Sequence, residues 1–240
     1  MCCLGVFAKL PQAGTVKTRL GESIGAAAAA ELYSAFIQDI AAMMRSGGWP
    51  TVWAYAPDNV ESRAWFESLP VVAAQLWPQP AGALGDRLAA FFAAQFAQGV
   101  DRVVVIGTDS PTLPPEYIAL TFHYLATHDV VLGPATDGGY YLLGLRRDAE
   151  NPLPPASATG VKPWPAVLFE GIPWSGPEVC QQTLDRIRLA GRSLALLPPW
   201  YDIDQVDDLN CLTRHLSALR AAGLGNLCPA TQAVLSRLHL

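Results

Sequence analysis

The sequence predicts an α/β fold in which a mostly parallel sheet is flanked by helices. Short β-branched or apolar runs alternate with longer segments of helical periodicity along most of the chain, and such alternation implies parallel strands joined by right-handed crossovers. The run Val103–Ile106 is apolar without interruption, as expected of a strand buried on both faces of such a sheet. The 240 residues, 51% of them hydrophobic, suffice for one large domain, and we expect residues 1–240 to form it.

The individual elements follow from local patterns. The expected strands are short runs rich in β-branched, aliphatic or aromatic residues, namely Leu4–Ala8, Thr51–Ala56, Val71–Leu76, Val103–Ile106, Val130–Leu132 and Leu194–Leu197. The expected helices carry apolar residues at helical spacing and span Gly25–Arg45, Val60–Ser68, Leu84–Gln98, Tyr117–Thr127, Glu178–Ala190 and Val206–Leu219. The segment Asn151–Pro165 contains five prolines and little periodicity, which is typical of an extended loop.

Composition and charge argue against several classes of partner. The net charge of −5, with Lys and Arg scattered along the chain, disfavours nucleic acids and anionic membranes, because both select a clustered basic face. The most apolar stretch, Ala26–Ala30, is too short for a membrane span, and Met1–Leu4 lacks the basic segment of a signal peptide. We therefore expect a cytoplasmic protein. Its five cysteines form no C-x-x-C pair and are expected to be reduced; they are Cys2, Cys3, Cys180, Cys211 and Cys228.

Acidic residues follow three of the expected strands. Asp109 comes directly after Val103–Ile106, Asp137 follows Val130–Leu132, and Asp202-Ile203-Asp204 follows Leu194–Leu197. Ligands of open α/β sheets gather beyond the carboxyl ends of the strands, where these side chains should meet. In an extended backbone, Asp202 and Asp204 would point to one side and Ile203 to the other. Carboxylates at such a position suit Mg²⁺ or Mn²⁺, which are held by one or two carboxylates and the phosphates of a substrate.

Each acidic cluster also has a purely structural interpretation. Asp109 before Ser-Pro could cap a turn, and Asp137-Gly138-Gly139 could be simple turn chemistry. Asp204 could cap the following helix, whose first turn contains Asp207 and Asp208 as solvated residues favoured by the helix dipole. The coincidence at three strand ends favours function over these alternatives.

A basic loop follows the first expected strand. Lys9 ends that strand, and Gly14, Lys17, Thr18 and Arg19 follow within ten residues. A glycine turn with cations and free backbone N–H groups suits a phosphate, although the spacing is not that of a Walker A loop. A solvated basic turn is the alternative. A second glycine turn, Gly85-Asp86-Arg87, either approaches a nucleotide or merely begins a helix.

Other chemistries find less support. The histidines His123, His128, His215 and His239 show no metal-ligand spacing, and we interpret them as structural. No serine occupies a G-x-S-x-G elbow. Tryptophans such as Trp164 and Trp174 would pack in the core or shape a pocket.

Six ordered motifs together resemble a known family. They are Phe7-Ala8-Lys9-x-Pro11-x-x-Gly14-x-Val16-Lys17-Thr18-Arg19-Leu20, Gly85-x-Arg87-Leu88, Gly107-Thr108-Asp109-Ser110-Pro111, Asp137-Gly138-Gly139-Tyr140-Tyr141-Leu142-x-Gly144, Phe169-x-Gly171-Ile172-Pro173-Trp174-Ser175 and Asp202-Ile203-Asp204-x-x-x-Asp208-Leu209. The set resembles the bacterial GT-A-type glycosyltransferase family, also called radical-SAM/selenodomain-associated transferase 1. That family is similar to the 2-phospho-L-lactate guanylyltransferases and, more distantly, to the molybdenum-cofactor nucleotidyltransferases. The resemblance runs from about residue 4 to residue 210. One departure is Ser175-Gly176-Pro177, where the family usually has Ser-Thr-Pro.

The resemblance implies a Rossmann-like nucleotide-diphospho-sugar transferase (GT-A) fold and assigns roles to the motifs. Asp109, Asp202 and Asp204 would hold the metal, and Asp137 and Tyr140 would line the acceptor or sugar side. We expect Asp109 and Asp137 to be the catalytic carboxylates. Lys9, Lys17 and Arg19 would face the phosphates, and we expect Gly14, Thr18, Gly85 and Arg87 to complete the phosphate or nucleotide side. The acceptor or sugar side would comprise Gly138, Gly139, Tyr140 and Trp174.

The leading functional hypothesis is metal-dependent transfer from a nucleotide-activated donor, most simply a nucleotide sugar, to a small-molecule acceptor of unknown identity. A nucleotidyltransferase that consumes a nucleoside triphosphate and releases pyrophosphate would use the same groups. A nucleotide-binding protein without turnover is a different class, and substitution of Asp109 would then alter affinity alone. A kinase or ATPase is disfavoured by the missing Walker glycine. Assembly of two copies into a homodimer is compatible with each of these hypotheses.

Overall fold

The computed structural model describes residues 1–69, 75–148, 164–174, 176–224 and 227–238. Its described residues contain a seven-stranded sheet in the order β3-β2-β1-β4-β6-β5-β7. The strands are β1 (Cys2–Lys9), β2 (Thr51–Ala56), β3 (Gln75–Pro78), β4 (Arg102–Ile106), β5 (Val130–Pro134), β6 (Tyr140–Arg146) and β7 (Leu194–Leu196). The helices are α1 (Thr18–Ile24), α2 (Ala26–Gly47), α3 (Val60–Glu67), α4 (Leu84–Ala97), α5 (Pro115–Tyr124), α6 (Val179–Leu189), α7 (Val206–Ala221) and α8 (Pro229–Leu238), with a 3₁₀ turn η1 (Ala166–Phe169).

The sheet is parallel except for one strand. β6 runs antiparallel to both of its neighbours, β4 and β5, whereas the remaining pairs are parallel. β1, β2, β3, β4, β5 and β7 therefore point the same way, and their carboxyl ends meet at one edge of the sheet. The expectation of a mostly parallel α/β sheet is confirmed, and its edge of strand ends is the place where such sheets bind ligands.

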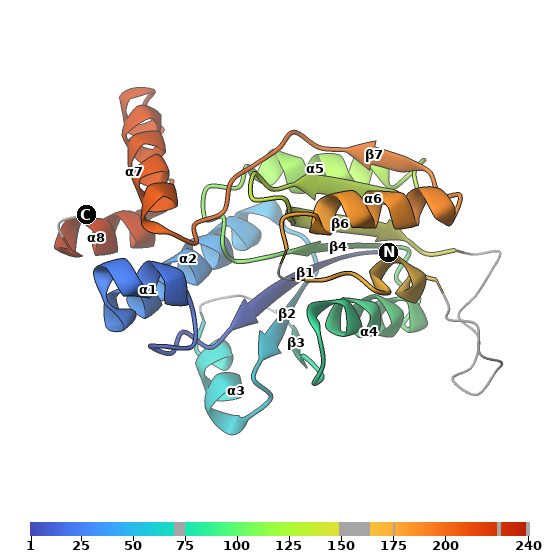
Figure 1. Ribbon diagram of the computed structural model, residues 1–240, viewed down its shortest axis with the longest axis horizontal. Helices are drawn as coiled ribbons and strands as arrows, with labels where there is room; N and C mark the ends of the chain where they lie inside the picture. Colours follow the sequence, from blue (N-terminus) through green and yellow to red (C-terminus); the bar gives the residue numbers. More distant parts are fainter. Residues whose placement is uncertain (70–74, 149–163, 175, 225–226, 239–240) are drawn as a thin grey trace.

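Helices cover both faces of the sheet, and alternate residues of each central strand enter different cores. Val104 and Ile106 of β4 pack in a core that also draws on α2, α5, α7 and α8. Val103 and Val105 pack on the opposite face with α4, η1 and α6. Figure 1 shows α4 and α6 in front of the sheet and α2 and α5 behind it. Burial on both faces explains why β4 is apolar without interruption.

Some elements depart from the sequence-based expectations. α1 occupies residues that we expected to form a basic turn, and Gly25, with φ of 90°, separates it from α2. α1 has only seven residues, of which Leu20 alone is buried, so its sequence shows no apolar stripe that would predict a helix. α8 and η1 were not expected either. β3 begins at Gln75, whereas the strand was expected from Val71; residues 71–74, and most of the proline-rich segment, lie outside the described residues.

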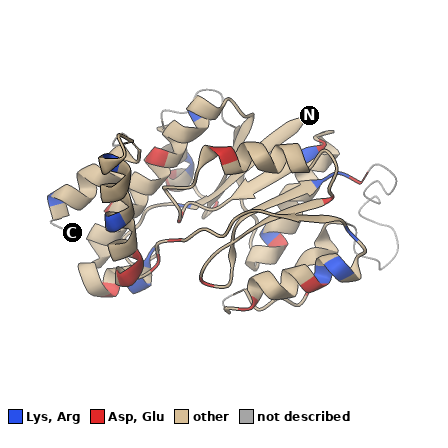
Figure 2. Cartoon of the chain, turned by 90° about the horizontal axis from the view of Figure 1, so that it is seen from above, with Lys and Arg blue, Asp and Glu red and all other residues tan. Residues whose placement is uncertain are grey.

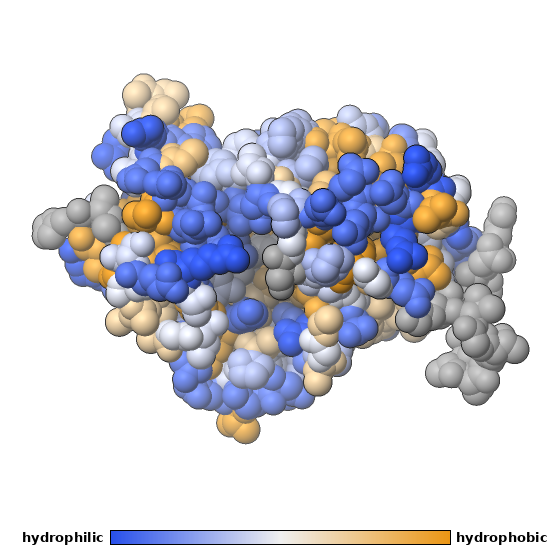
Figure 3. Space-filling model, viewed as in Figure 1, coloured by the Kyte–Doolittle hydropathy of each residue, from blue (hydrophilic) through white to orange (hydrophobic). Residues whose placement is uncertain are grey.

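Charged and apolar residues are both spread over the surface of the described residues. Acidic and basic residues are interspersed over the described helices rather than gathered on one side (Figure 2). The face shown in Figure 3 is largely hydrophilic, with apolar residues in small separate patches. None of the described helices has both the length and the apolarity needed to cross a bilayer.

Candidate functional site

The basic loop after β1 meets the acidic loops after β4 and β7. Lys17 closes the first loop in a left-handed backbone conformation (φ 48°) immediately before α1. Its side chain is only 5% exposed, and its Nζ forms an ion pair with Oδ1 of Asp109 and lies 4.0 Å from Oδ1 of Asp204. Arg19, which is largely exposed, places its guanidinium 3.1 Å from the other oxygen of Asp204. Four residues predicted for the site are thus connected in a chain of ion pairs.

A hydrogen-bonded chain through Tyr33 holds the start of this arrangement. The backbone N–H of Lys9 donates to the Tyr33 hydroxyl (3.1 Å), which is bonded to Oγ1 of Thr108 (2.7 Å), and Thr108 in turn donates to the carbonyl of Phe7 (3.3 Å). The end of β1 and the residue before Asp109 are therefore fixed to each other by a buried side chain of α2. The Lys17 ammonium also lies over the Tyr33 ring, 5.9 Å from its centroid.

Tyr33 is a residue of the site that the sequence did not reveal. It sits on the apolar face of a long helix, where an aromatic residue normally means core packing. Burial, with a smaller contribution from the negative charge of Asp109, holds the pKa of its phenol well above the usual value. The hydroxyl therefore stays neutral and serves as a fixed hydrogen-bonding group.

The loops after β4 and β7 are also tied together. The N–H of Ile203 donates to the carbonyl of Asp109 (2.9 Å), and the Ser110 hydroxyl donates to the carbonyl of Tyr201 (2.9 Å). Ile203 is fully buried, whereas Asp202 and Asp204 are only half-buried. The two carboxylates therefore leave the core where Ile203 enters it, as the expected alternation requires.

Asp202 lies in an acidic environment. Burial is the main factor that raises the pKa of its carboxyl to about 6, and the negative charges of Asp137 and Asp109 contribute, while Lys17 opposes the shift. The carboxylates after β4, β5 and β7 thus act on one another electrostatically. This is the behaviour expected of acidic groups that converge without enough counter-charge.

The structure corrects the interpretation of the first turn of α7. Asp204 does not cap this helix. Oδ2 of Asp208 instead accepts hydrogen bonds from the N–H groups of Asp204 (3.0 Å) and Gln205 (2.7 Å). Asp208 is thus more than a solvated residue of the first turn, because its carboxylate caps the helix, while the Asp204 carboxylate contacts Lys17 and Arg19.

Asp137 combines a turn role with a place at the sheet edge. Its Oδ1 accepts the N–H of Gly139 (2.8 Å) in the turn between β5 and β6, so the turn chemistry considered as an alternative is real. Gly138 has φ of 94°, and a Cβ there would lie 1.8 Å from the carbonyl oxygen of Pro177. This position therefore requires glycine for close packing and for its backbone conformation.

The residues predicted for the acceptor side meet the start of α4. The Trp174 indole packs directly on Gly85, and the Tyr140 ring meets the same indole edge-on with centroids 6.4 Å apart. Gly85 thus has a packing role. Arg87 donates from Nε to the carbonyl of Gly82 (3.0 Å) and approaches Oε1 of Gln79 (3.4 Å), so it also stabilises its own loop.

Three further predicted residues lie beside the ion-paired group without joining it. Lys9 ends β1, Gly14 lies in the loop that follows, and Thr18 begins α1; all three are exposed. Gly14 has φ of 79° and open space where a Cβ would be, so a ligand could approach its backbone. Their roles at a phosphate stay predictions.

The donor chemistry fits a hard divalent cation. Asp109 and Asp204 already share one cation, the Lys17 ammonium, and oxygen ligands of this kind are those that Mg²⁺ and Mn²⁺ use. Among the described residues, however, no group of three or more His, Cys, Asp and Glu side chains stands ready to hold a metal. The expected set of Asp109, Asp202 and Asp204 is therefore not assembled in this conformation and stays a prediction.

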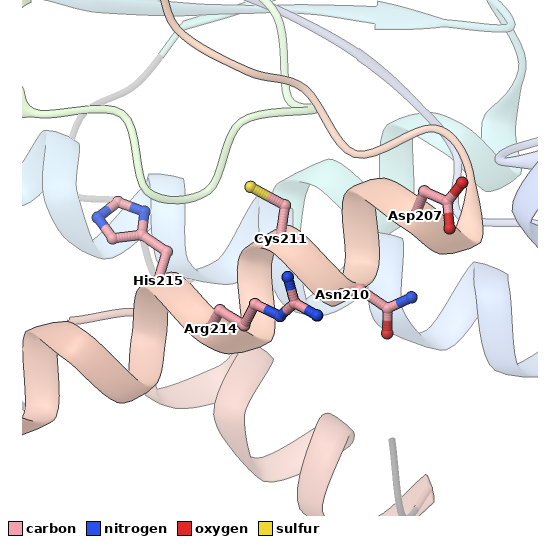
Figure 4. A pocket seen from close by; sticks show the side chains of 5 residues that line it. All are labelled: Asp207, Asn210, Cys211, Arg214 and His215. Atoms are coloured by element: carbon pink, nitrogen blue, oxygen red, sulfur yellow. The ribbon is translucent and has the colours of Figure 1, made fainter.

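A separate hollow of about 580 Å³ lies along α7. It is lined by Asp207, Asn210, Cys211, Arg214 and His215, all from this one helix (Figure 4). Nδ1 of His215 is 2.6 Å from the Tyr201 hydroxyl and its ring packs edge-on against Trp200, so the structural interpretation of this histidine fits its contacts. None of the lining residues was predicted for the site.

A family model described as an uncharacterized protein conserved in bacteria (DUF2064) matches residues 39–176, more than half of the 240 residues. The chain belongs to the DUF2064 family. No curated protein matches its sequence. A crystal structure of a candidate nucleotide-diphospho-sugar transferase from Desulfovibrio desulfuricans G20 is similar to this DUF2064 chain, with 32% identity, a TM-score of 0.82, and coverage of 99% of this chain and 97% of that one.

Two more distant structures share the fold of this DUF2064 protein. A cytidylyltransferase from Leptospira borgpetersenii serovar Hardjo-bovis has 10% identity and a TM-score of 0.55, with coverage of 98% and 94% of the two chains. A 4-diphosphocytidyl-2C-methyl-D-erythritol synthase has 12% identity and a TM-score of 0.50, with coverage of 88% and 95%. The expected nucleotide-diphospho-sugar transferase fold is confirmed, and the Desulfovibrio and Leptospira proteins are transferases by description. The finer resemblance to guanylyltransferases stays a prediction.

Proposed function

We propose that this protein is a metal-dependent transferase that takes a nucleotide-activated donor, and that a nucleotide-diphospho-sugar is the first candidate donor. The observation that carries the proposal is the contact of Lys17 with Asp109 and Asp204. It brings a basic loop and two acidic loops together at the carboxyl edge of the sheet, where a phosphate needs cations and a metal needs carboxylates.

In this proposal the acidic residues hold the metal. Asp109, Asp202 and Asp204 would bind Mg²⁺ or Mn²⁺, which would neutralise charge on the pyrophosphate of the donor. Lys17 and Arg19 would face the phosphates, with the exposed Lys9 nearby. Their positive charges would stabilise the leaving nucleotide as negative charge develops on it.

The acceptor side would lie toward the turn between β5 and β6. Asp137 is the candidate catalytic carboxylate there, because its charge already acts on Asp202. Tyr140 and Trp174 would supply an aromatic wall, and the close packing of Gly138 and Gly139 would fix the turn. A sugar or another small acceptor with hydroxyl groups suits such a mixed aromatic and acidic surface.

Nucleotidyl transfer is the second candidate function. Lys9, Lys17 and Arg19 all lie between the end of β1 and the first turn of α1, and together with a metal they could balance the charge of a nucleoside triphosphate. Attack would then fall on the α-phosphorus and release pyrophosphate, whereas glycosyl transfer would release a nucleoside diphosphate. The released product distinguishes the two.

A thermal-shift screen of nucleotide sugars and nucleoside triphosphates, with and without Mn²⁺, tests the proposal. A ligand at about 100 times its dissociation constant should stabilise the protein by about 2.7 kcal/mol, and Mn²⁺ should be required. Asp109→Asn should abolish the effect. Asp207→Asn, an exposed carboxylate three positions from Asp204, is the matched control and should retain it. The proposal fails if no nucleotide shifts the melting temperature under either condition.

A further inference from the structure

Lys17 is unusual because its side chain is buried although it belongs to a loop at the surface of the proposed site. Its side chain is 5% exposed, while that of Arg19, two positions later, is 65% exposed. A lysine amine is seldom buried unless a charge partner compensates for the lost hydration. The partner here is Asp109, with Asp204 at 4.0 Å, and the Tyr33 ring lies beneath the ammonium.

The backbone around Lys17 directs its side chain inward. The residue adopts a left-handed conformation, which a side chain other than glycine rarely takes without compensation. The ion pair with Asp109 offers that compensation. The next residue begins α1, and the N–H of Gly21 donates to the carbonyl of Lys17 (2.8 Å), so the backbone is anchored while the long side chain remains the adjustable part.

The charges of the site are balanced mainly by this one amine. Asp109 and Asp204 contact it directly, and Asp204 has only the exposed Arg19 as a second cation among the described contacts. Without Lys17, the two carboxylates would face each other across the space that its ammonium now fills. A divalent ion held by the same two carboxylates would take over both that space and that counter-charge.

We propose that Lys17 is the resident counter-ion of this acidic site, and that a divalent cation enters by displacing the Lys17 ammonium, which is thereby released toward the phosphates of the incoming nucleotide. This inference rests on the proposed function, because it takes Mg²⁺ or Mn²⁺ as the entering ion. The proposed function treats metal binding by the carboxylates and phosphate binding by Lys17 as separate events, and this inference couples them. Metal entry and delivery of a phosphate-binding cation become one exchange.

The first test is the affinity for Mn²⁺ alone, measured without nucleotide by the electron paramagnetic resonance signal of the free ion. Lys17→Met removes the competing charge, so Mn²⁺ should bind at least about tenfold more tightly than to the wild type. Arg45→Met is the control, since it removes one positive charge at an exposed position in the last turn of α2, outside the predicted site; its affinity should stay within about threefold of the wild type. Equal or weaker binding by Lys17→Met overturns the exchange.

The second test uses the unmodified protein and therefore does not depend on the folding of a variant. The chain has only three lysines, Lys9, Lys17 and Lys162, so acylation of amines can be assigned by mass spectrometry. Lys17 should react slowly without metal, and saturating Mn²⁺ should raise its labelling rate roughly tenfold, while that of Lys9 stays constant. Continued protection of Lys17 in saturating Mn²⁺ overturns the proposal.

The outcomes separate this inference from the proposed function. If Mn²⁺ binds, Asp109→Asn removes the binding, and Lys17 stays protected throughout, then the metal site stands and the exchange alone is wrong. If Mn²⁺ binds neither the wild type nor Lys17→Met, then metal dependence and the exchange both fail. Tighter binding by Lys17→Met together with metal-induced labelling of Lys17 supports both.

Discussion

The indole of Trp174 lies directly over Gly85, so that a Cβ on this glycine would be only 2.6 Å from Cζ2 of the ring. The contact joins the first turn of α4 to the segment that precedes α6. The same indole meets Tyr140 edge-on, and the Phe169 ring lies 6.0 Å from it between centroids. One missing side chain thus allows an aromatic cluster to form beside the site.

Gly85→Ala should displace that indole. Because the ring is held by two other aromatic residues, we expect the free energy of unfolding to fall by about 1–3 kcal/mol, together with a change in tryptophan fluorescence. Urea unfolding followed by fluorescence measures both. Gly107→Ala, where a Cβ would have nothing within 4 Å, is the control and should change stability by less than about 0.5 kcal/mol. Equal losses for the two variants would contradict this interpretation.

Tyr33→Phe should loosen the connection between the ends of β1 and β4. It removes the hydroxyl that accepts from the N–H of Lys9 and bonds Thr108, and leaves both groups without this partner. We expect a loss of about 1–3 kcal/mol in denaturant unfolding. Tyr124→Phe, at the half-exposed end of α5, should cost less than about 0.5 kcal/mol. A neutral Tyr33→Phe would show that the hydrogen-bonded chain contributes nothing to stability.

Asp39→Ala should release the start of α8. The Asp39 carboxylate on α2 accepts the N–H groups of Ala230 (2.9 Å) and Thr231 (2.8 Å), and so caps a helix from 191 residues away in the sequence. Its loss should lower the free energy of unfolding by about 2–4 kcal/mol and speed amide exchange in α8, as hydrogen-exchange mass spectrometry would show. Asp185→Ala, at a half-exposed residue of α6, should leave α8 protected.

Asp202→Asn should stabilise the metal-free protein in a pH-dependent way. The pKa of this carboxyl is raised from 3.8 to about 6 in the folded state, so its favourable contribution is complete below pH 4 and is lost as the pH rises through 6. At pH 7 the variant should exceed the wild type by about 1 kcal/mol, a value reduced for solvent screening of the partly exposed group. At pH 4 the difference should vanish. Urea unfolding of both proteins at pH 4 and pH 7, in the presence of a chelator, measures this difference in the free energy of unfolding. A difference that does not change with pH would refute the raised pKa of Asp202.

The sequence predicted most of the sheet because the relevant signals are local. The uninterrupted apolar run of β4 reports burial on both faces, and the turn residues after it place Asp109 at a strand end. The direction of β6 has no such signal. Tyr140–Arg146 is apolar in the manner of a parallel strand, and only its pairing with β4 and β5 shows that it runs the other way.

The details of the site depended on contacts between distant residues. Nothing near Lys17 in the sequence indicates that its amine is buried against Asp109, and nothing near Tyr33 distinguishes it from a core aromatic residue. Asp208 was expected in the right turn, but its hydrogen bonds required the backbone path of Asp204 and Gln205. Residue types could thus be predicted for this site, whereas their partners could not.

The capture of α8 by Asp39 also has a consequence for synthesis on the ribosome. The Sγ of Cys228 donates to the carbonyl of Pro111, in the loop that carries Asp109, across 117 positions of the chain. At 5–20 residues per second, Asp39 is translated roughly 10–40 s before its partners in α8. Pro111 precedes Cys228 by 117 residues, which corresponds to roughly 6–23 s at the same rate, so the loop that carries Asp109 lacks this hydrogen bond until Cys228 has been translated.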